Sequence, residues 1–178
     1  MSSFVSIAKA SALVALIFSI ANCALGGENK QLPKNHEQPR ITDYEIKGRY
    51  VFDKKRHLTW DRCSFGMQWQ HGNCSGEPKL VTYQAAAHAA RDQGSGWRVP
   101  SVEELFNLAA AFHGQAKKRT LFFPGFIDLG ENESSYWSSS VFKEFPGYYG
   151  YVDMMNGSVD IHSAGFSLGV VFVKLSGE

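Results

Sequence analysis

The sequence predicts an α+β domain in which strands lie at both ends of the folded part and two helices lie between them. Short runs rich in β-branched and aromatic residues begin at Ile41, and a long apolar run, residues 166–175, lies near the end of the chain. Between them, two segments have apolar residues at helical spacing, and each begins at a side chain that caps helices. A doubly wound parallel sheet is excluded, because its strands and helices alternate along the chain.

Three short strands are expected at the start of the domain. They are residues 41–46, 49–52 and 58–60, and residues 54–57 form a turn between the second and the third. The following segment, residues 63–78, contains three glycines, an asparagine and a proline, so we predict a loop there.

Cys63 and Cys74 are separated by ten residues, and in an exported chain this pair is expected to form a disulfide that closes the loop. We expect the bond to contribute about 2–3 kcal/mol by restricting the unfolded chain. Two free thiols are disfavoured outside the cytosol. A zinc site is also disfavoured, because no third and fourth ligand stand at a usable spacing.

The first helix is expected to begin at Thr82, whose side chain can cap it, and to end at Gly94-Ser95-Gly96. Its helical face is formed by small and aromatic residues: Tyr83, Ala86, Ala87 and Ala90. The alanines indicate close packing against a neighbouring element.

The second helix follows a bend at Pro100. This proline disfavours helical angles for Val99, so residues 97–99 are expected to be extended. Ser101 and Glu104 form a capping box, in which each side chain accepts a hydrogen bond from the backbone of the other residue. An apolar stripe then faces the core through Leu105, Phe106, Leu108, Ala109 and Phe112. We predict structural roles for Trp97, Ser101, Glu104 and Trp137, with Trp97 as a core side chain.

The C-terminal third is expected to consist of strands. Residues 136–140 form one of them. Asn156-Gly157, a favoured pair for a type I′ turn, predicts a hairpin of residues 151–155 and 158–162. Residues 166–175 are predicted to form a long apolar strand that is buried on both faces.

Residues 1–26 are predicted to be a signal peptide. Lys9 is its single charged residue, and the apolar run that follows, about a dozen residues, is too short to span a bilayer. Cleavage after Gly26 fits the small residues at 24–26, whereas residues 20–23 resemble a lipoprotein box with cleavage between Asn22 and Cys23 and a lipid on Cys23. Residues 27–40 are expected to be a flexible tether, and residues 41–178 one domain.

The charge of the chain excludes some partners. Loss of the signal peptide leaves 17 basic and 17 acidic residues, so the mature chain has no net charge. Nucleic acid and strongly anionic membranes are therefore poor candidates, because both are bound through a basic face. A lipid on Cys23 is the sole membrane attachment that the sequence suggests.

Several landmarks occur in a fixed order between residues 49 and 174: Arg49-Tyr50, residues 58–60, the two cysteines around Gly66 and Trp69, residues 97–105, Phe123-Pro124 and residues 136–140. In combination they resemble the Lcl C-terminal domain family, which was formerly a domain of unknown function. The resemblance implies a compact fold similar to C-type lectins and the formylglycine-generating enzyme, with the N- and C-terminal strands paired. It also implies an exported, often surface-attached or adhesive protein and, in the namesake, the binding of sulfated polysaccharides.

Two positions depart from the family pattern. Tyr83 stands where many members have a tryptophan, and Phe172 stands in a strand where arginine is common. The first difference is expected to change packing only. The second removes support for an anion-binding role of that strand.

No catalytic residue is expected. Chemistry of the formylglycine-generating type needs late cysteines as copper ligands, and no cysteine follows Cys74. Related iron enzymes need clustered histidines, whereas the six histidines of this chain are scattered. The three serines at 138–140 lack the Gly-x-Ser-x-Gly sequence that surrounds a nucleophile. A catalytic relative of the formylglycine-generating enzyme is the less favoured alternative.

No cofactor is expected either, and calcium is the alternative to that expectation. Oxygen ligands of the kind calcium prefers are carried by Asp128, Glu131, Asn132 and Glu133. The sugar-binding tripeptides of calcium-dependent lectins, with a proline between two carboxylate or amide residues, are missing. A solvated loop is therefore the favoured interpretation of this segment.

Two groups of side chains are candidates for ligand binding. The aromatic group follows Phe145-Pro146-Gly147 and consists of Tyr148, Tyr149 and Tyr151. Tyrosine rings have an apolar face and a polar edge, which suits stacking on sugars or contact with a protein. The basic group suits sulfate or carboxylate groups and consists of Lys117, Lys118 and Arg119, with residues 54–56 as a further candidate.

The sequence therefore favours an exported, lectin-like module that binds carbohydrate, including sulfated polysaccharide, or a cell-surface protein. Its expected location is periplasmic, outer-membrane-associated or secreted, in a bacterium. The alternative is a cell-envelope structural or assembly component without affinity for sugar. In a binding module the aromatic and basic groups should share one face, whereas their separation favours the envelope role.

Overall fold

The computed structural model describes residues 38–94, 96–126 and 134–177, which belong to one unit, Glu37–Glu178. The predicted signal peptide, the lipid site at Cys23, most of the tether and the calcium candidates Asp128, Glu131, Asn132 and Glu133 lie outside the described residues. Within the described ranges, none of the helices is both long and apolar enough to cross a membrane.

The first sheet contains four antiparallel strands in the order β1-β2-β3-β9. Their bounds are β1 Tyr44–Lys47, β2 Tyr50–Asp53, β3 Leu58–Asp61 and β9 Val173–Leu175. The expected pairing of the terminal strands is wrong, because β9 pairs with β3 while β1 lies at the opposite edge. Short turns place β2 and β3 beside β1 in succession, and β9 adds to the edge next to β3.

The strand predicted at 41–46 begins later than expected. Residues Ile41–Asp43 form a single 3₁₀ turn, η1. The Asp43 carboxylate accepts a hydrogen bond from the Arg40 backbone N–H at 3.0 Å, and the Asp43 N–H donates to the Arg40 carbonyl at 2.9 Å. These two bonds fold the chain back on itself before β1 begins.

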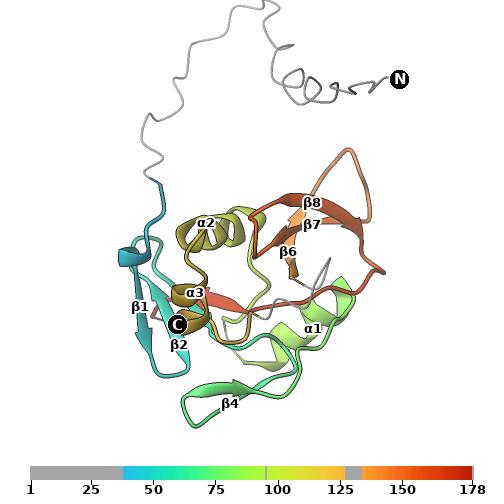
Figure 1. Ribbon diagram of the computed structural model, residues 1–178. Coiled ribbons are helices and arrows are strands. Elements are labelled where there is room, and N and C mark those ends of the chain that lie inside the picture. The colour runs from blue at the N-terminus through green and yellow to red at the C-terminus, as the bar shows by residue number, and fades with distance from the viewer. Residues whose placement is uncertain (1–37, 95, 127–133, 178) are drawn as a thin grey trace, which may run out of the picture. The chain divides into compact units, whose positions relative to one another are not determined.

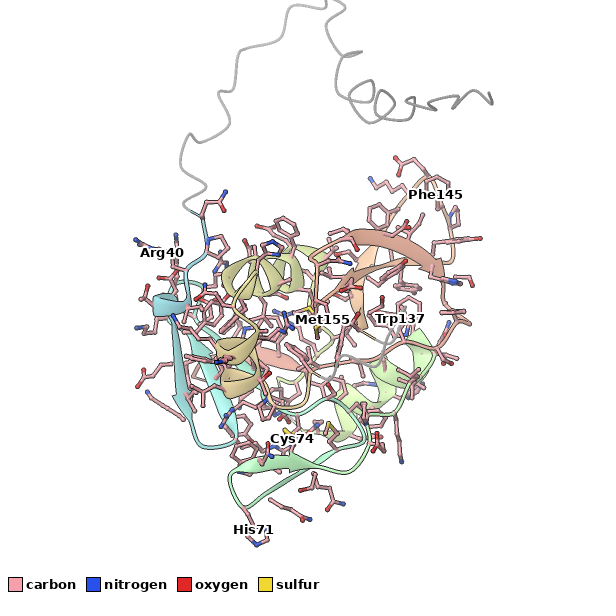
Figure 2. All side chains as sticks on the ribbon, viewed as in Figure 1. Arg40, His71, Cys74, Trp137, Phe145 and Met155 are labelled. Atoms are coloured by element: carbon pink, nitrogen blue, oxygen red, sulfur yellow. A yellow bond between two sulfur atoms is a disulfide. The ribbon has the colours of Figure 1, made fainter. Side chains whose placement is uncertain are left out.

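The segment predicted as a loop, residues 63–78, contains a hairpin of β4, Gln68–Gln70, and β5, Asn73–Ser75. His71 and Gly72 both have positive φ angles, 50° and 83°, as a type I′ turn requires. The predicted disulfide between Cys63 and Cys74 is confirmed. Figure 2 shows His71 at the tip of this hairpin, with Cys74 closer to the body of the domain.

The described residues form three α-helices, whereas the sequence predicted two. They are α1 Tyr83–Asp92, α2 Val102–Phe112 and α3 Ala116–Phe122. The predicted start of α1 is confirmed, because Thr82 Oγ1 accepts a hydrogen bond from the Ala85 N–H at 3.3 Å. Helix α3 has no side-chain cap at its first end, so the sequence carries no start signal for it.

The apolar stripe of α2 is narrower than predicted. Its buried members include Leu105, Leu108 and Phe112, whereas Phe106 is 47% exposed. Phe106 follows Leu105 and therefore projects about 100° away from it around the helix, beyond the edge of the stripe. The stripe packs against the inner face of the first sheet, which contributes Tyr44, Val51, Leu58 and Trp60.

The second sheet is antiparallel and consists of β6 Ser135–Val141, β7 Tyr148–Asp153 and β8 Val159–Ser163. The predicted hairpin of β7 and β8 is confirmed, but the predicted type I′ turn is wrong. Gly157 has a positive φ of 77° and Asn156 does not, and residues 154–158 form a longer connection. Asp153 Oδ1 organises it by accepting hydrogen bonds from the Met155 N–H at 2.7 Å and the Asn156 N–H at 3.1 Å.

The apolar run at 166–175 is buried as predicted over Leu168 to Val173, but it is not one strand, and Phe166 is exposed. It bonds to a different neighbour at each step. Leu168 pairs with Val81, Gly169 bonds to β6, and only Val173–Leu175 joins a ladder. This run connects the two sheets with α1 and forms the centre of the second apolar cluster, which includes Ala86, Ala90, Trp137, Leu168, Val170 and Phe172.

The two tryptophans that were predicted to be structural differ in burial. Trp137 is fully buried, and its indole N–H donates to the Val81 carbonyl at 2.7 Å. Trp97 is half-buried at the edge of the same cluster, between the Tyr50 ring at 5.6 Å and the Lys174 ammonium at 5.3 Å. The expectation that Trp97 is a core side chain is therefore wrong, because residues 97–99 run along the rim of the first sheet.

Candidate functional site

The hairpin of β7 and β8 presents aromatic side chains on one of its faces. Tyr149 is opposite His162, and Tyr151 is opposite Asp160. Because alternate residues of a strand point to the same face, these four side chains share a face of the sheet. Tyr148 lies between the facing positions and therefore points to the other face.

Two further aromatic rings stack on this face. The Tyr83 ring stacks on Tyr149, with centroids 3.5 Å apart and planes at 19°, and the Phe166 ring stacks on His162 at 3.8 Å and 20°. Phe166 is 42% exposed, and the other rings are partly exposed. We call the set the aromatic face; it consists of Tyr83, Tyr149, Tyr151, His162 and Phe166.

Backbone hydrogen bonds fix the elements that carry these rings. The Tyr83 N–H at the start of α1 donates to the Ala164 carbonyl at 3.1 Å, and the Ala164 N–H donates to the Gly147 carbonyl at 3.0 Å. The Phe166 N–H donates to the Ser163 carbonyl at 3.0 Å. The segments that carry the aromatic face are therefore held together by backbone hydrogen bonds.

Two phenols of the aromatic face, those of Tyr83 and Tyr151, keep their protons at neutral pH. Burial raises the pKa of Tyr83, and the neighbouring Tyr149 raises it further, while Arg91 opposes these effects. Burial also raises the pKa of Tyr151, with smaller contributions from Asp160 and Asp153. Both hydroxyls can therefore donate as well as accept hydrogen bonds.

Tyr148 belongs to a separate pair. It is 42% exposed and packs edge-on against Phe145, which is 53% exposed. Figure 2 shows Phe145 at an outer corner of the domain, in the connection between β6 and β7. The structure thus divides the three predicted tyrosines, with Tyr149 and Tyr151 on the aromatic face and Tyr148 on the opposite face of the same strand.

The predicted basic group lies on α3, where Lys117 and Lys118 are exposed and Arg119 is half-buried. The end of α3 lies beside the turn between β1 and β2, because Arg62 bonds to both. Its guanidinium donates to the carbonyls of Leu121 at 2.6 Å, Phe122 at 2.7 Å and Gly48 at 2.7 Å. Figure 1 shows α3 near β1 and β2 and away from β7 and β8, so the two candidate groups are carried by separate parts of the domain.

Comparison with known protein families gives a match to the Lcl C-terminal domain family over residues 49–174. The chain belongs to this family. No curated protein matches the chain. The matched range begins immediately before β2 and ends within β9, so it leaves out β1 but contains β2, β3, the second sheet and the aromatic face.

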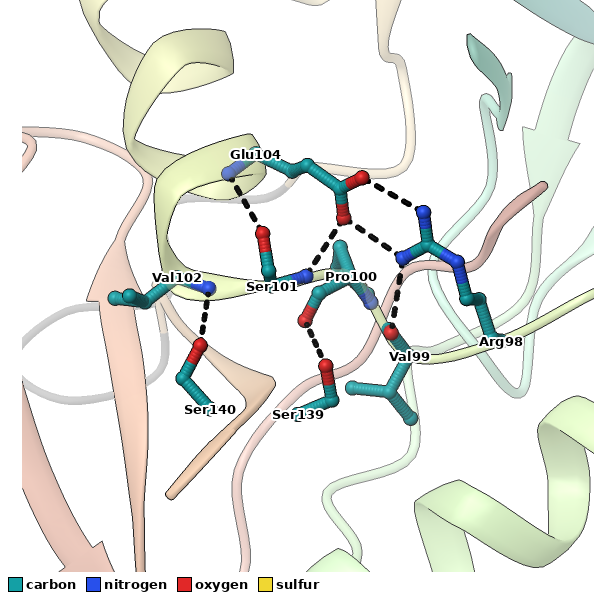
Figure 3. A network of polar contacts seen from close by, with 8 residues as sticks. All are labelled: Arg98, Val99, Pro100, Ser101, Val102, Glu104, Ser139 and Ser140. Carbon is teal, nitrogen blue, oxygen red and sulfur yellow. Dashed lines mark hydrogen bonds and ion pairs between the residues drawn. The ribbon is translucent and has the colours of Figure 1, made fainter. Parts of the chain in front are cut away.

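The serines of β6 serve as connections within the Lcl C-terminal domain. Ser138 is fully buried and its hydroxyl donates to the Gly150 carbonyl at 2.8 Å. The Ser139 hydroxyl donates to the Pro100 carbonyl at 3.3 Å, and Ser140 Oγ accepts from the Val102 N–H at 3.0 Å. Figure 3 shows how the last two serines join β6 to the start of α2.

The predicted capping box is confirmed and is larger than expected. Ser101 Oγ accepts from the Glu104 N–H at 3.2 Å, and the Glu104 carboxylate accepts from the Ser101 N–H at 2.7 Å. Arg98 completes it, because two of its guanidinium nitrogens donate to the same carboxylate at 2.7 Å each (Figure 3). Burial opposes ionisation of Glu104, but these hydrogen bonds outweigh it and lower its pKa.

Within residues 38–94, 96–126 and 134–177, no group of three or more histidine, cysteine, aspartate or glutamate side chains could hold a metal ion. The buried Asp61 carboxylate instead accepts hydrogen bonds from Arg49 at 2.7 Å and from the Cys63 N–H at 3.0 Å. It therefore serves an internal ion pair of the Lcl C-terminal domain.

Three side chains of the aromatic face were not among the predicted ligand-binding residues: Tyr83, His162 and Phe166. Tyr83 had been assigned to packing in the first helix, and Phe166 to a buried strand. A signal for His162 was available in the alternation of the predicted hairpin, since it occupies the same face as Tyr149 and Tyr151. No local signal places Tyr83 there, because its contact with Tyr149 joins segments more than 60 residues apart.

Proposed function

We propose that this Lcl C-terminal domain is a non-enzymatic module that binds carbohydrate through the aromatic face. One observation supports the proposal above all others: two stacked ring pairs lie on one partly exposed surface, because the neighbouring strands β7 and β8 carry Tyr149 and His162, on which Tyr83 and Phe166 stack. Planar rings stack on the C–H faces of sugars, and tyrosine hydroxyls bond to sugar hydroxyls.

We further propose that the domain has a fold similar to C-type lectins and acts outside the cytoplasm. The α+β architecture with several antiparallel sheets is compatible with such a fold. The disulfide between Cys63 and Cys74 suggests an oxidising, non-cytoplasmic compartment. Export through the predicted signal peptide is consistent with this non-cytoplasmic location.

A glycan array with wild-type protein and three variants tests the binding function. Tyr149→Ala removes a ring from the aromatic face, and Phe166→Ala removes an exposed ring whose loss does not open the core. Each should weaken binding to the retained glycan by at least about tenfold, as expected when a stacking contact of about 1.5 kcal/mol is lost. Lys117→Ala on the basic helix is the control and should leave binding unchanged.

Absence of binding to every glycan on the array contradicts the proposal. Binding that Phe166→Ala and Tyr149→Ala leave intact contradicts the assignment of the aromatic face, because the ligand must then contact another surface. Circular dichroism of each variant shows whether a loss of binding results from unfolding.

The separation of the basic and aromatic groups favours a second candidate, a structural or assembly component of the cell envelope without affinity for sugar. Helix α3, which carries Lys117 and Lys118, lies near β1 and β2 and away from β7 and β8. In this role the aromatic face contacts a protein of the cell surface. Cross-linking of isolated envelopes through a photoreactive residue at position 166 then labels a protein, and protein-free glycans do not compete.

A further inference from the structure

The aromatic face has an acidic rather than a basic surrounding. Residues 145–173, which supply β7, β8 and the Phe166 loop, contain no lysine or arginine and two acidic residues, Asp153 and Asp160. Both carboxylates act on Tyr151, and Asp160 is its direct partner across the hairpin. An anionic ligand on this face therefore meets two negative charges and no cation from these strands.

The two aspartates differ in whether a carboxylate oxygen remains available to accept a hydrogen bond from a ligand. Asp153 is occupied by the connection after β7, because Oδ1 accepts two backbone N–H groups and Oδ2 accepts the Ser134 hydroxyl at 2.9 Å. Asp160 is exposed, and its Oδ1 accepts the Ile161 N–H at 2.8 Å. Its Oδ2 has no hydrogen-bond partner in the described part of the chain, so it can accept from a ligand hydroxyl.

Arg91 of α1 acts on the Tyr83 side of the aromatic face: its charge opposes the rise in the Tyr83 pKa, and its guanidinium contacts His88 Nδ1 at 2.8 Å. At Tyr151, the charges that act on the pKa are those of Asp160 and Asp153. Lys143 precedes the acidic segment and is followed directly by Glu144. The basic group of α3 lies beside the turn between β1 and β2.

We propose that the ligand of the aromatic face is an uncharged glycan, whose pyranose rings stack on the face and whose hydroxyls donate to Asp160. This inference rests on the carbohydrate-binding function proposed above and narrows its ligand class. Sulfated and uronate-bearing polysaccharides are excluded from the face, because their anionic groups lose hydration opposite a carboxylate without gaining a cation. Affinity then depends on ring contact and hydrogen bonds, so added salt has little effect on it.

Matched polysaccharide pairs test the ligand class. Wild-type protein is run through affinity gels that contain dextran or dextran sulfate, agarose or κ-carrageenan, and cellulose or cellulose sulfate. We expect at least one uncharged member to retard the protein, with its sulfated partner at least about tenfold weaker, and the same retardation in about 20 mM and about 0.5 M NaCl.

Two variants assign the effect to this surface. Phe166→Ala should reduce retardation by the uncharged polymer by at least about fivefold. Asp160→Asn keeps the acceptor for the Ile161 N–H and removes only the charge, so it should narrow the difference between the sulfated and unsulfated polymers. Lys117→Ala combined with Lys118→Ala is the control and should change neither.

The outcomes separate the inference from the function on which it rests. Tighter binding of a sulfated partner, weakened by salt and by the double lysine variant, overturns the inference and leaves carbohydrate binding in place. Failure of every polymer, charged or uncharged, to retard the protein overturns the carbohydrate-binding function itself. A sulfated-to-unsulfated ratio that Asp160→Asn does not change removes the electrostatic basis of the inference.

Discussion

Replacement of Glu104 by alanine is expected to destabilise the domain by about 2 kcal/mol. The substitution removes three hydrogen bonds of 2.7 Å, two from Arg98 and one from the Ser101 N–H. Loss of the cap costs about 1 kcal/mol. The bonds to Arg98 contribute about 1 kcal/mol more, reduced from the value for a buried pair because the Arg98 side chain is 41% exposed.

Urea unfolding followed by tryptophan fluorescence at neutral pH measures this loss. Glu103→Ala is the matched control, because Glu103 lies in the same first turn and has the same charge but is exposed. It should cost less than about 0.5 kcal/mol. A difference between the two variants below about 0.5 kcal/mol would refute the assigned role of the network.

The pH dependence of stability provides a second test of the role of Glu104. The hydrogen bonds lower the pKa of Glu104 in the folded state, so its contribution is present above the unfolded pKa of about 4.3. It disappears as the pH falls through the folded pKa, where the carboxylate becomes protonated in both states. The stability difference between wild type and Glu104→Ala should therefore narrow below about pH 4.

Three further predictions concern stability. Gly125→Ala should lower the free energy of unfolding in urea by about 1–3 kcal/mol, because the added Cβ would lie 2.5 Å from the Ser64 backbone nitrogen. Gly165→Ala is the control, since its Cβ enters open space and should change stability by less than about 0.5 kcal/mol. Equal effects of the two substitutions would contradict the contact at Gly125. Joint replacement of Cys63 and Cys74 by serine should lower the free energy of unfolding by about 2–3 kcal/mol. Thiol titration of the denatured, unreduced protein should find neither Cys63 nor Cys74 free. Trp97→Ala should cost about 1–2 kcal/mol rather than a full core deletion, and a thermal or urea loss above about 3 kcal/mol would show that its half-exposed position is misjudged.

Features whose determinants are close in sequence were predicted well. The capping box depends on Ser101 and Glu104, three residues apart, and the disulfide on two cysteines in one short segment. Neighbouring side chains decide both, so distant contacts do not overrule them. The hydrogen bonds from Arg98 to Glu104 were not predicted, because they form across the bend at Pro100.

Helix α3 was missed because a distant residue stabilises it. Arg62 precedes Phe122 by 60 residues, and its guanidinium donates hydrogen bonds to two carbonyls at the end of the helix. The positive charge also suits the negative end of the helix dipole. Residues 116–122 contain a short basic segment without a capping side chain at its start, so the sequence did not predict this helix.

The aromatic face was predicted only in part. The hairpin that carries it was predicted correctly, but the register of its two strands was not. A two-residue turn at Asn156-Gly157 would place Tyr151 opposite His162. The longer connection places Tyr149 opposite His162 and Tyr151 opposite Asp160. A shift of two residues keeps every side chain on its face, so the shared face of Tyr149 and Tyr151 survived the error while their partners changed.

The bond from the Ile161 N–H to Asp160 has a consequence for self-association. In β8 the even-numbered residues bond to β7, as the bonds of Ala164 and Ser158 indicate, so the Ile161 N–H points to the open edge of the sheet. Asp160 occupies that donor, and the Phe166 N–H occupies the Ser163 carbonyl on the same edge. An incoming strand from another copy would have to displace both contacts and approach a carboxylate, which protects this edge against the strand addition that begins aggregation.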